Sequence, residues 1–193
     1  EEDNVIVVSR DGWVKRQKEV KDISSTRLRE GDAVLAVLPG STKATVVFFT
    51  NSGVAYTAKI ADVPASTGYG EPIQKLFKLK DGEKIVGAAS MDDRVLPPKA
   101  TKVDEKHPEN APKIHGLAVT SDGYSLRFGL DTFREVSTRS GRRFARPANG
   151  AEVVLATVLT GDETIIAASQ NRRVIIARAD EINFLAGPGK GVI

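Results

Sequence analysis

The segment with the clearest chemical character is "STRSGRRFAR", residues 137–146, which holds four arginines and no acid. Guanidinium groups are permanently charged, planar donors that suit phosphate and carboxylate oxygens. The whole chain is close to charge balance, with 28 Lys and Arg against 25 Asp and Glu in 193 residues. Because the positive charge is concentrated locally, this segment predicts binding of an anionic partner. For isolated lysines such as Lys15 and Lys59, solvation of the surface is the better interpretation.

Residues for catalysis are poorly represented. The chain has no cysteine, which excludes disulfides, thiol nucleophiles and cysteine-based zinc sites. The two histidines, His107 and His115, lack metal-ligand spacing. The glycine-rich segments "GYGEP" (68–72) and "GPGKGV" (187–192) lack the other positions of dinucleotide and P-loop motifs. We therefore expect a binding module with no catalytic residue, cofactor or metal site of its own.

A repeated hairpin pattern positions these residues. Each copy has a short apolar run, a hydroxyl residue, a two-residue turn and a second short strand. The copies are "VIVVSRDGWVKR" from residue 5, "VVFFTNSGVAYT" from 46, "GLAVTSDGYSLR" from 116 and "IIAASQNRRVII" from 165, with hydroxyls at Ser9, Thr50, Thr120 and Ser169. Turns such as Asp-Gly predict β-hairpins of type I′. In the fourth copy Arg172 replaces the glycine, which predicts a looser turn or one of another type.

A glycine, an acid and a buried strand follow the first three hairpins, at 31–38, 82–90 and 150–159. A period of 40–50 residues with several short strands predicts an all-β, propeller-like fold with one four-stranded blade per repeat. The single domain, 1–193, then contains repeats at about 5–45, 46–90, 114–164 and 165–193. A β-sandwich is the alternative. Residues 91–113 are rich in Pro, Lys and Glu, and we expect a mobile inserted loop there.

Cations recur in the second hairpin strands and in the segments behind them. The candidate DNA-binding residues are Lys15, Arg16, Arg27, Arg29, Arg127, Arg139, Arg142, Arg143, Arg146, Arg172, Arg173 and Lys190. Alternation along a strand predicts that such residues face solvent. On successive blades they would form a stripe along one rim, which suits a phosphate backbone without reading bases. A curved stripe would also favour bent DNA. The alternative function is a propeller-like scaffold for protein partners.

Residues 46–84, "VVFFTNSGVAYTAKIADVPASTGYGEPIQKLFKLKDGEK", resemble one blade of the C-terminal domain of bacterial type IIA topoisomerase A subunits, those of DNA gyrase and topoisomerase IV. The most specific positions are Pro64, the small-residue turn after it and "GEPI" at 70–73. The opening "EEDNVIVVSRDGWVKR" is similar to the first blade of that domain, and the resemblance covers nearly the whole chain except 91–113. It implies a β-pinwheel, in which blades exchange strands and a basic outer rim binds and bends duplex DNA.

The resemblance also implies a larger enzyme around this chain. The chain would be the non-catalytic DNA-binding part of an ATP-dependent type II topoisomerase, an isomerase whose catalytic tyrosine, ATP and Mg lie elsewhere. Its partners would be double-stranded DNA, the B-type ATPase subunit, and the rest of the A-type polypeptide, in the bacterial cytoplasm at the nucleoid. We expect the isolated domain to be monomeric and without a membrane role. The chain begins "EEDNVIVVSR", which has no apolar signal segment and no initiator Met, so we expect a fragment of a longer protein.

The sequence departs from the family in three places, one of which is the unusual insertion at 91–113. Gyrase A subunits carry a Gln-Arg-Arg-Gly-Gly-Lys-Gly box after the first hairpin, where this chain reads "SSTRLREGDAV" (24–34). The nearest echo is Gly189-Lys190-Gly191. This departure favours the topoisomerase IV type, which relaxes and decatenates DNA, over the supercoiling gyrase type. The chain also has only about three and a half repeats, so we expect a ring that is either truncated or open.

Overall fold

The computed structural model describes all residues, 1–193, and consists almost entirely of short strands. The strands are β1 (Asp3–Ser9), β2 (Trp13–Gln17), β3 (Val34–Ser41), β4 (Thr45–Thr50), β5 (Val54–Lys59), β6 (Glu71–Pro72), β7 (Ile85–Ser90), β8 (His115–Thr120), β9 (Ser125–Phe128), β10 (Arg142–Arg143), β11 (Val153–Leu159), β12 (Thr164–Ala168), β13 (Val174–Arg178) and β14 (Phe184–Leu185). Besides single 3-10 turns there is one short helix, α1 (Pro98–Thr101), and no helix is long and apolar enough to span a membrane.

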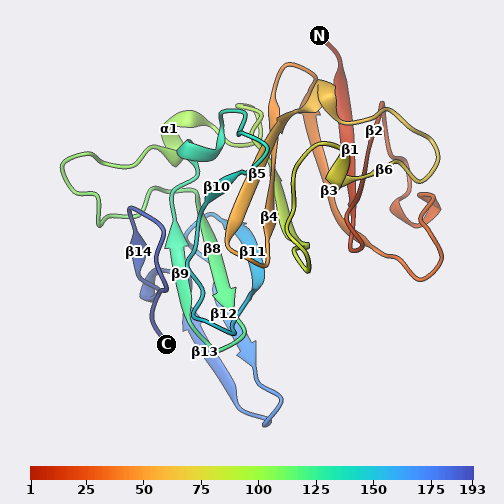
Figure 1. Cartoon of the computed structure of the whole chain (residues 1–193). Coiled ribbons are helices and arrows are strands. Elements are labelled where there is room, and N and C mark those ends of the chain that lie inside the picture. Colours follow the sequence, from red (N-terminus) through yellow and green to blue (C-terminus); the bar gives the residue numbers. More distant parts are fainter.

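The strands form four small sheets that follow one another along the chain (Figure 1). We call them blades A to D. Blade A has the strand order β3-β1-β2-β6, blade B β10-β5-β4-β7, blade C β11-β8-β9-β14, and blade D only β12-β13. The all-β, propeller-like prediction is therefore confirmed, and the two facing sheets of a sandwich are absent.

The outer strand of each four-stranded blade comes from the next repeat. Strand β6 of the second repeat pairs with β2, and β10 of the third pairs with β5. Strand β14 of the fourth repeat pairs with β9. Successive blades are thus locked together by the chain itself, because each blade needs a segment from the following repeat to complete its sheet.

All four hairpins close with the same turn. The third loop residue has positive φ in each copy: 82° at Gly12, 82° at Gly53, 87° at Gly123 and 61° at Arg172. The residue before it does not, so the loop is a type I turn followed by a left-handed residue, and the type I′ prediction is wrong. The prediction of a different fourth turn is also wrong, because Arg172 adopts the backbone conformation that glycine adopts elsewhere.

The recurring hydroxyl residues hold these turns. The oxygens of Ser9, Thr120 and Ser169 each accept the backbone N–H four residues later, at 3.0, 3.2 and 3.2 Å. Thr50 is fully buried and its hydroxyl donates to the Val54 carbonyl at 2.9 Å. The alignment of hydroxyls along the sequence therefore has a structural cause, since each one bridges the two strands of its hairpin.

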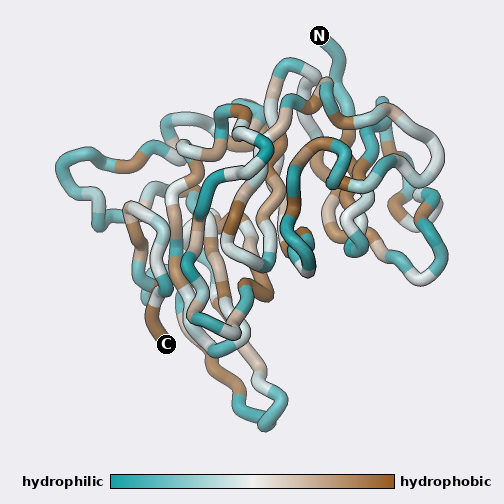
Figure 2. Tube along the Cα trace, in the orientation of Figure 1, coloured by the Kyte–Doolittle hydropathy of each residue, from teal (hydrophilic) through white to brown (hydrophobic).

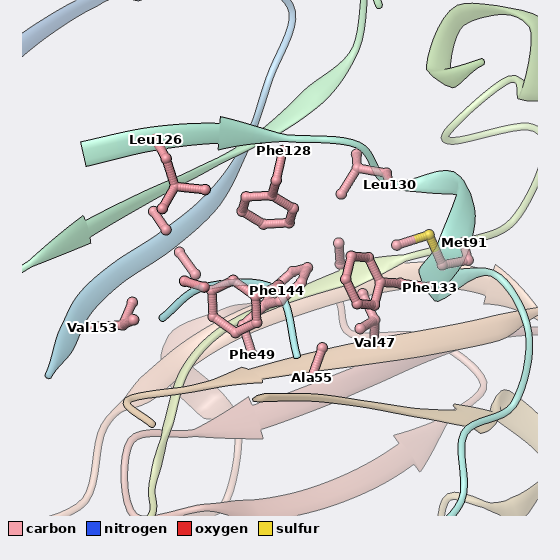
Figure 3. Close-up of a cluster of buried hydrophobic side chains, with 14 of the residues drawn as sticks. Val47, Phe49, Ala55, Met91, Leu126, Phe128, Leu130, Phe133, Phe144 and Val153 are labelled. Atoms are coloured by element: carbon pink, nitrogen blue, oxygen red, sulfur yellow. The ribbon is translucent and has the colours of Figure 1, made fainter. Parts of the chain in front are cut away.

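The core lies between the blades. One cluster joins blades A and B, and a second joins blades B and C, in which the ring of Phe49 meets Phe128, Phe133 and Phe144 edge-on at centroid distances of 5.5, 6.0 and 5.1 Å (Figure 3). Apolar residues accordingly follow the strands, and polar residues follow the loops (Figure 2). Alternate residues of each hairpin face the preceding and the following blade, so both faces of blade B are buried.

Blade D differs from the others in its exposure. Only four buried residues join it to blade C: Leu117, Leu159, Ala179 and Ile182. Its hairpin projects from the body, as Figure 1 shows, and Ile166, Val174, Ile175 and Ile176 are 61–69% exposed. The equivalent positions of blade B are buried between two blades.

The insertion at 91–113 is anchored at its start, so the prediction of a mobile loop is wrong for residues 91–101. The carboxylate of Asp92 is buried and accepts the Ser41 N–H at 2.7 Å. It also accepts the Arg94 N–H at 2.9 Å and the Arg94 guanidinium at 2.8–3.0 Å. Arg134 holds the same segment by donating to the Met91 and Leu96 carbonyls at 3.3 and 2.6 Å.

We expect Asp92→Asn to destabilise the protein in a pH-dependent way. The Arg94 guanidinium and nearby amide donors hold the pKa of Asp92 well below its ordinary 3.8, against the opposing effect of burial. A carboxyl with a depressed folded-state pKa stabilises the fold fully above its unfolded pKa of about 4, and this contribution is lost as the pH falls further. Urea unfolding should therefore show a loss of about 2 kcal/mol at pH 7 that shrinks at pH 2.5.

The exposed neighbour Asp93 provides the matched control for this prediction, because its side chain is 74% exposed and meets only Arg134. Asp93→Asn should change stability by less than about 1 kcal/mol at both pH values. An Asp92→Asn loss of equal size at pH 7 and 2.5 would contradict the electrostatic explanation.

Candidate nucleic-acid interface

Three turns of the chain run along the outer edges of the blades, and we call 66–72, 137–143 and 186–193 the exchange turns. The first two end in the exchanged strands β6 and β10, whereas the third follows β14 and returns to blade C, where Val192 bridges Ser125. Each contains a glycine of positive φ, at Gly70, Gly141 and Gly191, where a Cβ would collide with a backbone carbonyl of the preceding repeat. The segment "STRSGRRFAR" begins with the second of these turns. Three of its four arginines are thus carried by an element that the fold repeats, and Arg146 follows directly behind it.

Hydrogen bonds join these turns into a continuous row. The Arg146 N–H donates to the Gly189 carbonyl at 2.7 Å, and the Lys78 N–H donates to the Arg139 carbonyl at 3.0 Å. At the other end, the Lys15 ammonium links the exchange turn at 66–72 to the loop at 18–33. We call residues 18–33, 66–80, 137–146 and 186–193 the rim.

Seven of the twelve predicted DNA-binding residues are exposed. Five of them lie on the rim: Arg27, Arg29, Arg139, Arg146 and Lys190. Two of these sit over aromatic rings, Arg29 with its Cζ 4.7 Å from the Trp13 centroid and Lys190 with its Nζ 3.9 Å from that of Tyr124. Such contacts fix the position of a cation without neutralising its charge.

Arg172 and Arg173 are the other two exposed residues. They lie at the tip of the projecting β12–β13 hairpin, and their backbone N–H groups bond only within that hairpin, to Ser169. The structure thus separates them from the hydrogen-bonded row that carries the other five cations.

Lys15 is not on the surface, so the expectation from strand alternation is wrong for it. The residue is 1% exposed, and its Nζ donates to the carbonyls of Arg27 and Gly68 at 2.8 Å each. Loop 18–33 and the exchange turn at 66–72 cover the face of β2 that carries it. Alternation within β2 could not predict this, because the covering loops come from other parts of the chain.

Arg16 and Arg127 occupy the same repeat position and are partly buried. The Nε of Arg16 donates to the Val63 carbonyl at 3.2 Å, and the Nε of Arg127 donates to the Ile182 carbonyl. Both carbonyls directly follow 3-10 turns of the next repeat, at Ile60–Asp62 and Ala179–Glu181. The two arginines therefore fasten the exchanged segments, and the solvent-facing orientation predicted for them is wrong.

Arg142 and Arg143 are also bound to the protein. Arg142 donates to the carbonyls of Thr132, Glu135 and Val136 at 2.6–3.1 Å, and Arg143 donates to those of Ser52 and Ala145 at 3.1 and 3.3 Å. Neither forms an ion pair, so both charges add to the positive potential of the rim. Their donors are used within the fold, which leaves Arg139 and Arg146 as the free cations of this segment.

Comparisons with known proteins agree with this architecture. A family model described as "DNA gyrase C-terminal domain, beta-propeller" matches residues 44–90 and 117–158. The A subunit of DNA gyrase from Rickettsia bellii is 24% identical over 94% of this chain, and the A subunit of DNA topoisomerase 4 from Caulobacter vibrioides is 29% identical over 42%. The solved E. coli ParC C-terminal domain superposes with a TM-score of 0.74 at 20% identity, covering 100% of this chain and 71% of that one. A solved C-terminal domain of DNA topoisomerase IV gives a TM-score of 0.81 at 20% identity, covering 99% and 56%.

The chain is similar to the C-terminal domains found in the A subunits of gyrase and topoisomerase IV. Its fold is the β-pinwheel of those domains, with strands exchanged between blades. The chain spans 26% of the length of the Rickettsia gyrase protein and 11% of the Caulobacter topoisomerase protein.

Three exposed rim cations without an ion pair were missed by sequence reasoning: Lys18, Lys78 and Lys80. The residue at the offset of Arg146 behind its own turn is Lys75, which pairs with Glu71 at 2.7 Å. The repeat therefore contained no signal for Lys78 and Lys80.

The histidines of this domain lie apart from the rim cations. His115 is buried, its Nδ1 lies 2.8 Å from the Pro112 carbonyl, and burial lowers its pKa. His107 is exposed beside Glu109, in the insertion. No group of three or more His, Asp or Glu side chains is arranged to hold a metal ion.

Proposed function

We propose that this chain binds duplex DNA without sequence preference along its rim and bends it. The observation that carries the proposal is the hydrogen-bonded row of exchange turns, because it arranges exposed cations from four segments in a line. Arg and Lys in such a row contact phosphates, and each contact releases condensed counterions. Because the row follows the outer edges of successive blades, a duplex lying along it would curve.

We further propose that the chain acts as the C-terminal domain of an A-type polypeptide in an ATP-dependent type II topoisomerase. Cleavage of DNA and ATP hydrolysis would then belong to other parts of the assembly, including a B-type subunit, in the bacterial cytoplasm. The absence of a gyrase-type box at 24–34 supports the relaxing and decatenating type over the supercoiling type.

A binding titration tests the proposal. Fluorescence anisotropy with two 30-bp duplexes of unrelated sequence should give equal affinities within about threefold, since phosphate contacts carry no sequence information. Energy transfer between dyes at the two duplex ends should rise on binding. A strong preference for one sequence would contradict non-specific binding. Absence of binding to either duplex would support the protein-interaction scaffold instead.

A further inference from the structure

The position of Lys15 in the repeat is unusual. The equivalent residues of the other hairpins are Tyr56, Leu126 and Ile175, all large and apolar. Tyr56 packs in the cluster between blades A and B, and Leu126 packs in the cluster between blades B and C. This position therefore points toward the preceding blade. Blade A stands first in the row, and a lysine occupies the position there.

Three alternate residues of β2 hold the rim against this face of blade A. Lys15 donates to the Arg27 and Gly68 carbonyls, both at 2.8 Å. Gln17 donates from its Nε2 to the Ser66 carbonyl at 3.0 Å. The ring of Trp13 lies beneath the Arg29 guanidinium. The loop and the exchange turn, which are distant in sequence, thus meet on one strand.

Lys15, the central residue of the three, makes two hydrogen bonds to the rim, whereas Gln17 makes one. An ammonium that is 1% exposed needs strong acceptors, and the two carbonyls supply them. Burial and then the charge of Arg27 lower the pKa of Lys15. Loss of the ammonium would leave the carbonyls of Arg27 and Gly68 without their donor. The loop that presents Arg27 and Arg29 would then lose its attachment to the exchange turn.

We propose that Lys15 is a positioning residue of the DNA-binding rim, whose buried ammonium sets the placement of Arg27 and Arg29 relative to the exchange turn at 66–72. The proposal rests on the proposed function. It assigns Lys15 no contact with DNA. It also replaces the direct phosphate contact expected from the sequence with an indirect action through two exposed arginines.

The test is a double-mutant cycle on DNA affinity. Each phosphate contact contributes about fivefold to affinity between 1 M and 0.15 M salt, from a slope of about 0.9 per contact. Lys15→Met should therefore lower affinity roughly 25-fold in 0.15 M salt, as should the double variant Arg27→Gln/Arg29→Gln. In the Arg27→Gln/Arg29→Gln background, Lys15→Met should cause no further loss. A further 25-fold loss in that background would overturn the proposal.

Lys59→Met is the matched control, because this exposed lysine at the end of β5 lies outside the rim, carries the same charge and holds no carbonyl. It should lower affinity less than about fivefold. Lys15→Gln keeps N–H donors without the charge, so it should recover most of the affinity. This variant replaces Lys15→Met in the test if the methionine variant unfolds. An equal effect of Lys59→Met and Lys15→Met would overturn the proposal, because general charge would then explain the loss.

Trp13 gives a readout that does not depend on DNA, since it is the single tryptophan of the chain. Lys15→Met should increase quenching of Trp13 fluorescence by acrylamide, because Arg29 leaves the ring when the loop detaches. Unchanged quenching would overturn the proposal. If the unmodified chain failed to bind DNA while Lys15→Met still exposed Trp13, the proposed function would fail and the anchoring by Lys15 would stand.

Discussion

Replacing Arg139, Arg146 and Lys190 together with glutamine should lower the affinity for duplex DNA on the order of 100-fold in 0.15 M salt. These three cations are exposed on two rim segments, 137–146 and 186–193, which are joined by the hydrogen bond from the Arg146 N–H to the Gly189 carbonyl. Three lost phosphate contacts, at about fivefold each, give this factor. The loss should be the same for unrelated sequences, and the slope of log affinity against log salt should flatten by about 2.7 units.

The matched control for this variant removes three cations from the insertion. Lys99, Lys102 and Lys106 are exposed and lie outside the rim, so their replacement with glutamine changes net charge by the same amount. This triple variant should reduce DNA affinity by less than about tenfold, because it weakens only the overall electrostatic attraction between the protein and DNA. Equal losses from the two triple variants would show that position on the rim does not matter, and this would remove the exchange turns from the binding surface.

Gly87→Ala should be among the most destabilising single changes in the chain. Gly87 lies in β7 of blade B, where a Cβ would collide with the Ala156 carbonyl of β11 in blade C. Its φ is ordinary, so the effect comes from the close approach of two backbones and not from turn geometry. The clash can be relieved only if β7 and β11 separate, and this should lower the free energy of unfolding by about 3 kcal/mol. Thermal unfolding should then occur about 6–12 °C lower.

Gly187→Ala is the control for this change. A Cβ there meets no atom within 4 Å, and the residue is outside the left-handed region. The substitution should be neutral or stabilise by about 0.4–1 kcal/mol, because alanine restricts the unfolded chain. A melting temperature of Gly87→Ala within about 2 °C of the unmodified protein would contradict the tight packing of the inner strands.

The repeat in the sequence was sufficient to predict the blades, because each hairpin carries its own turn and its own hydroxyl bridge. It also located "STRSGRRFAR" on a recurring turn. The turn type was not predictable from the Asp-Gly pair alone, since the same pair fits a type I turn followed by a left-handed glycine. Arg172 shows most clearly that residue type alone does not determine the turn. Arginine disfavours positive φ, yet Arg172 has a φ of 61° because the hairpin keeps the shape of the other three.

The site was predicted less completely than the fold. Sequence spacing identified where cations recur, and it identified Arg139, Arg146 and Lys190 on the rim. It could not separate them from Arg16, Arg127 and Arg142, whose donors bind carbonyls. Those contacts depend on which segment of the next repeat lies against each strand, and alternation within one strand contains no such information. The burial of Lys15 has the same cause.

The salt dependence of DNA affinity tests the central claim most directly. Eight exposed rim cations without an ion pair (Lys18, Arg27, Arg29, Lys78, Lys80, Arg139, Arg146 and Lys190) predict a slope of log affinity against log salt of about −7. Between 50 and 200 mM salt, the affinity should fall by roughly 10⁴-fold. A slope shallower than about −2 would contradict a rim that binds the DNA backbone through these cations.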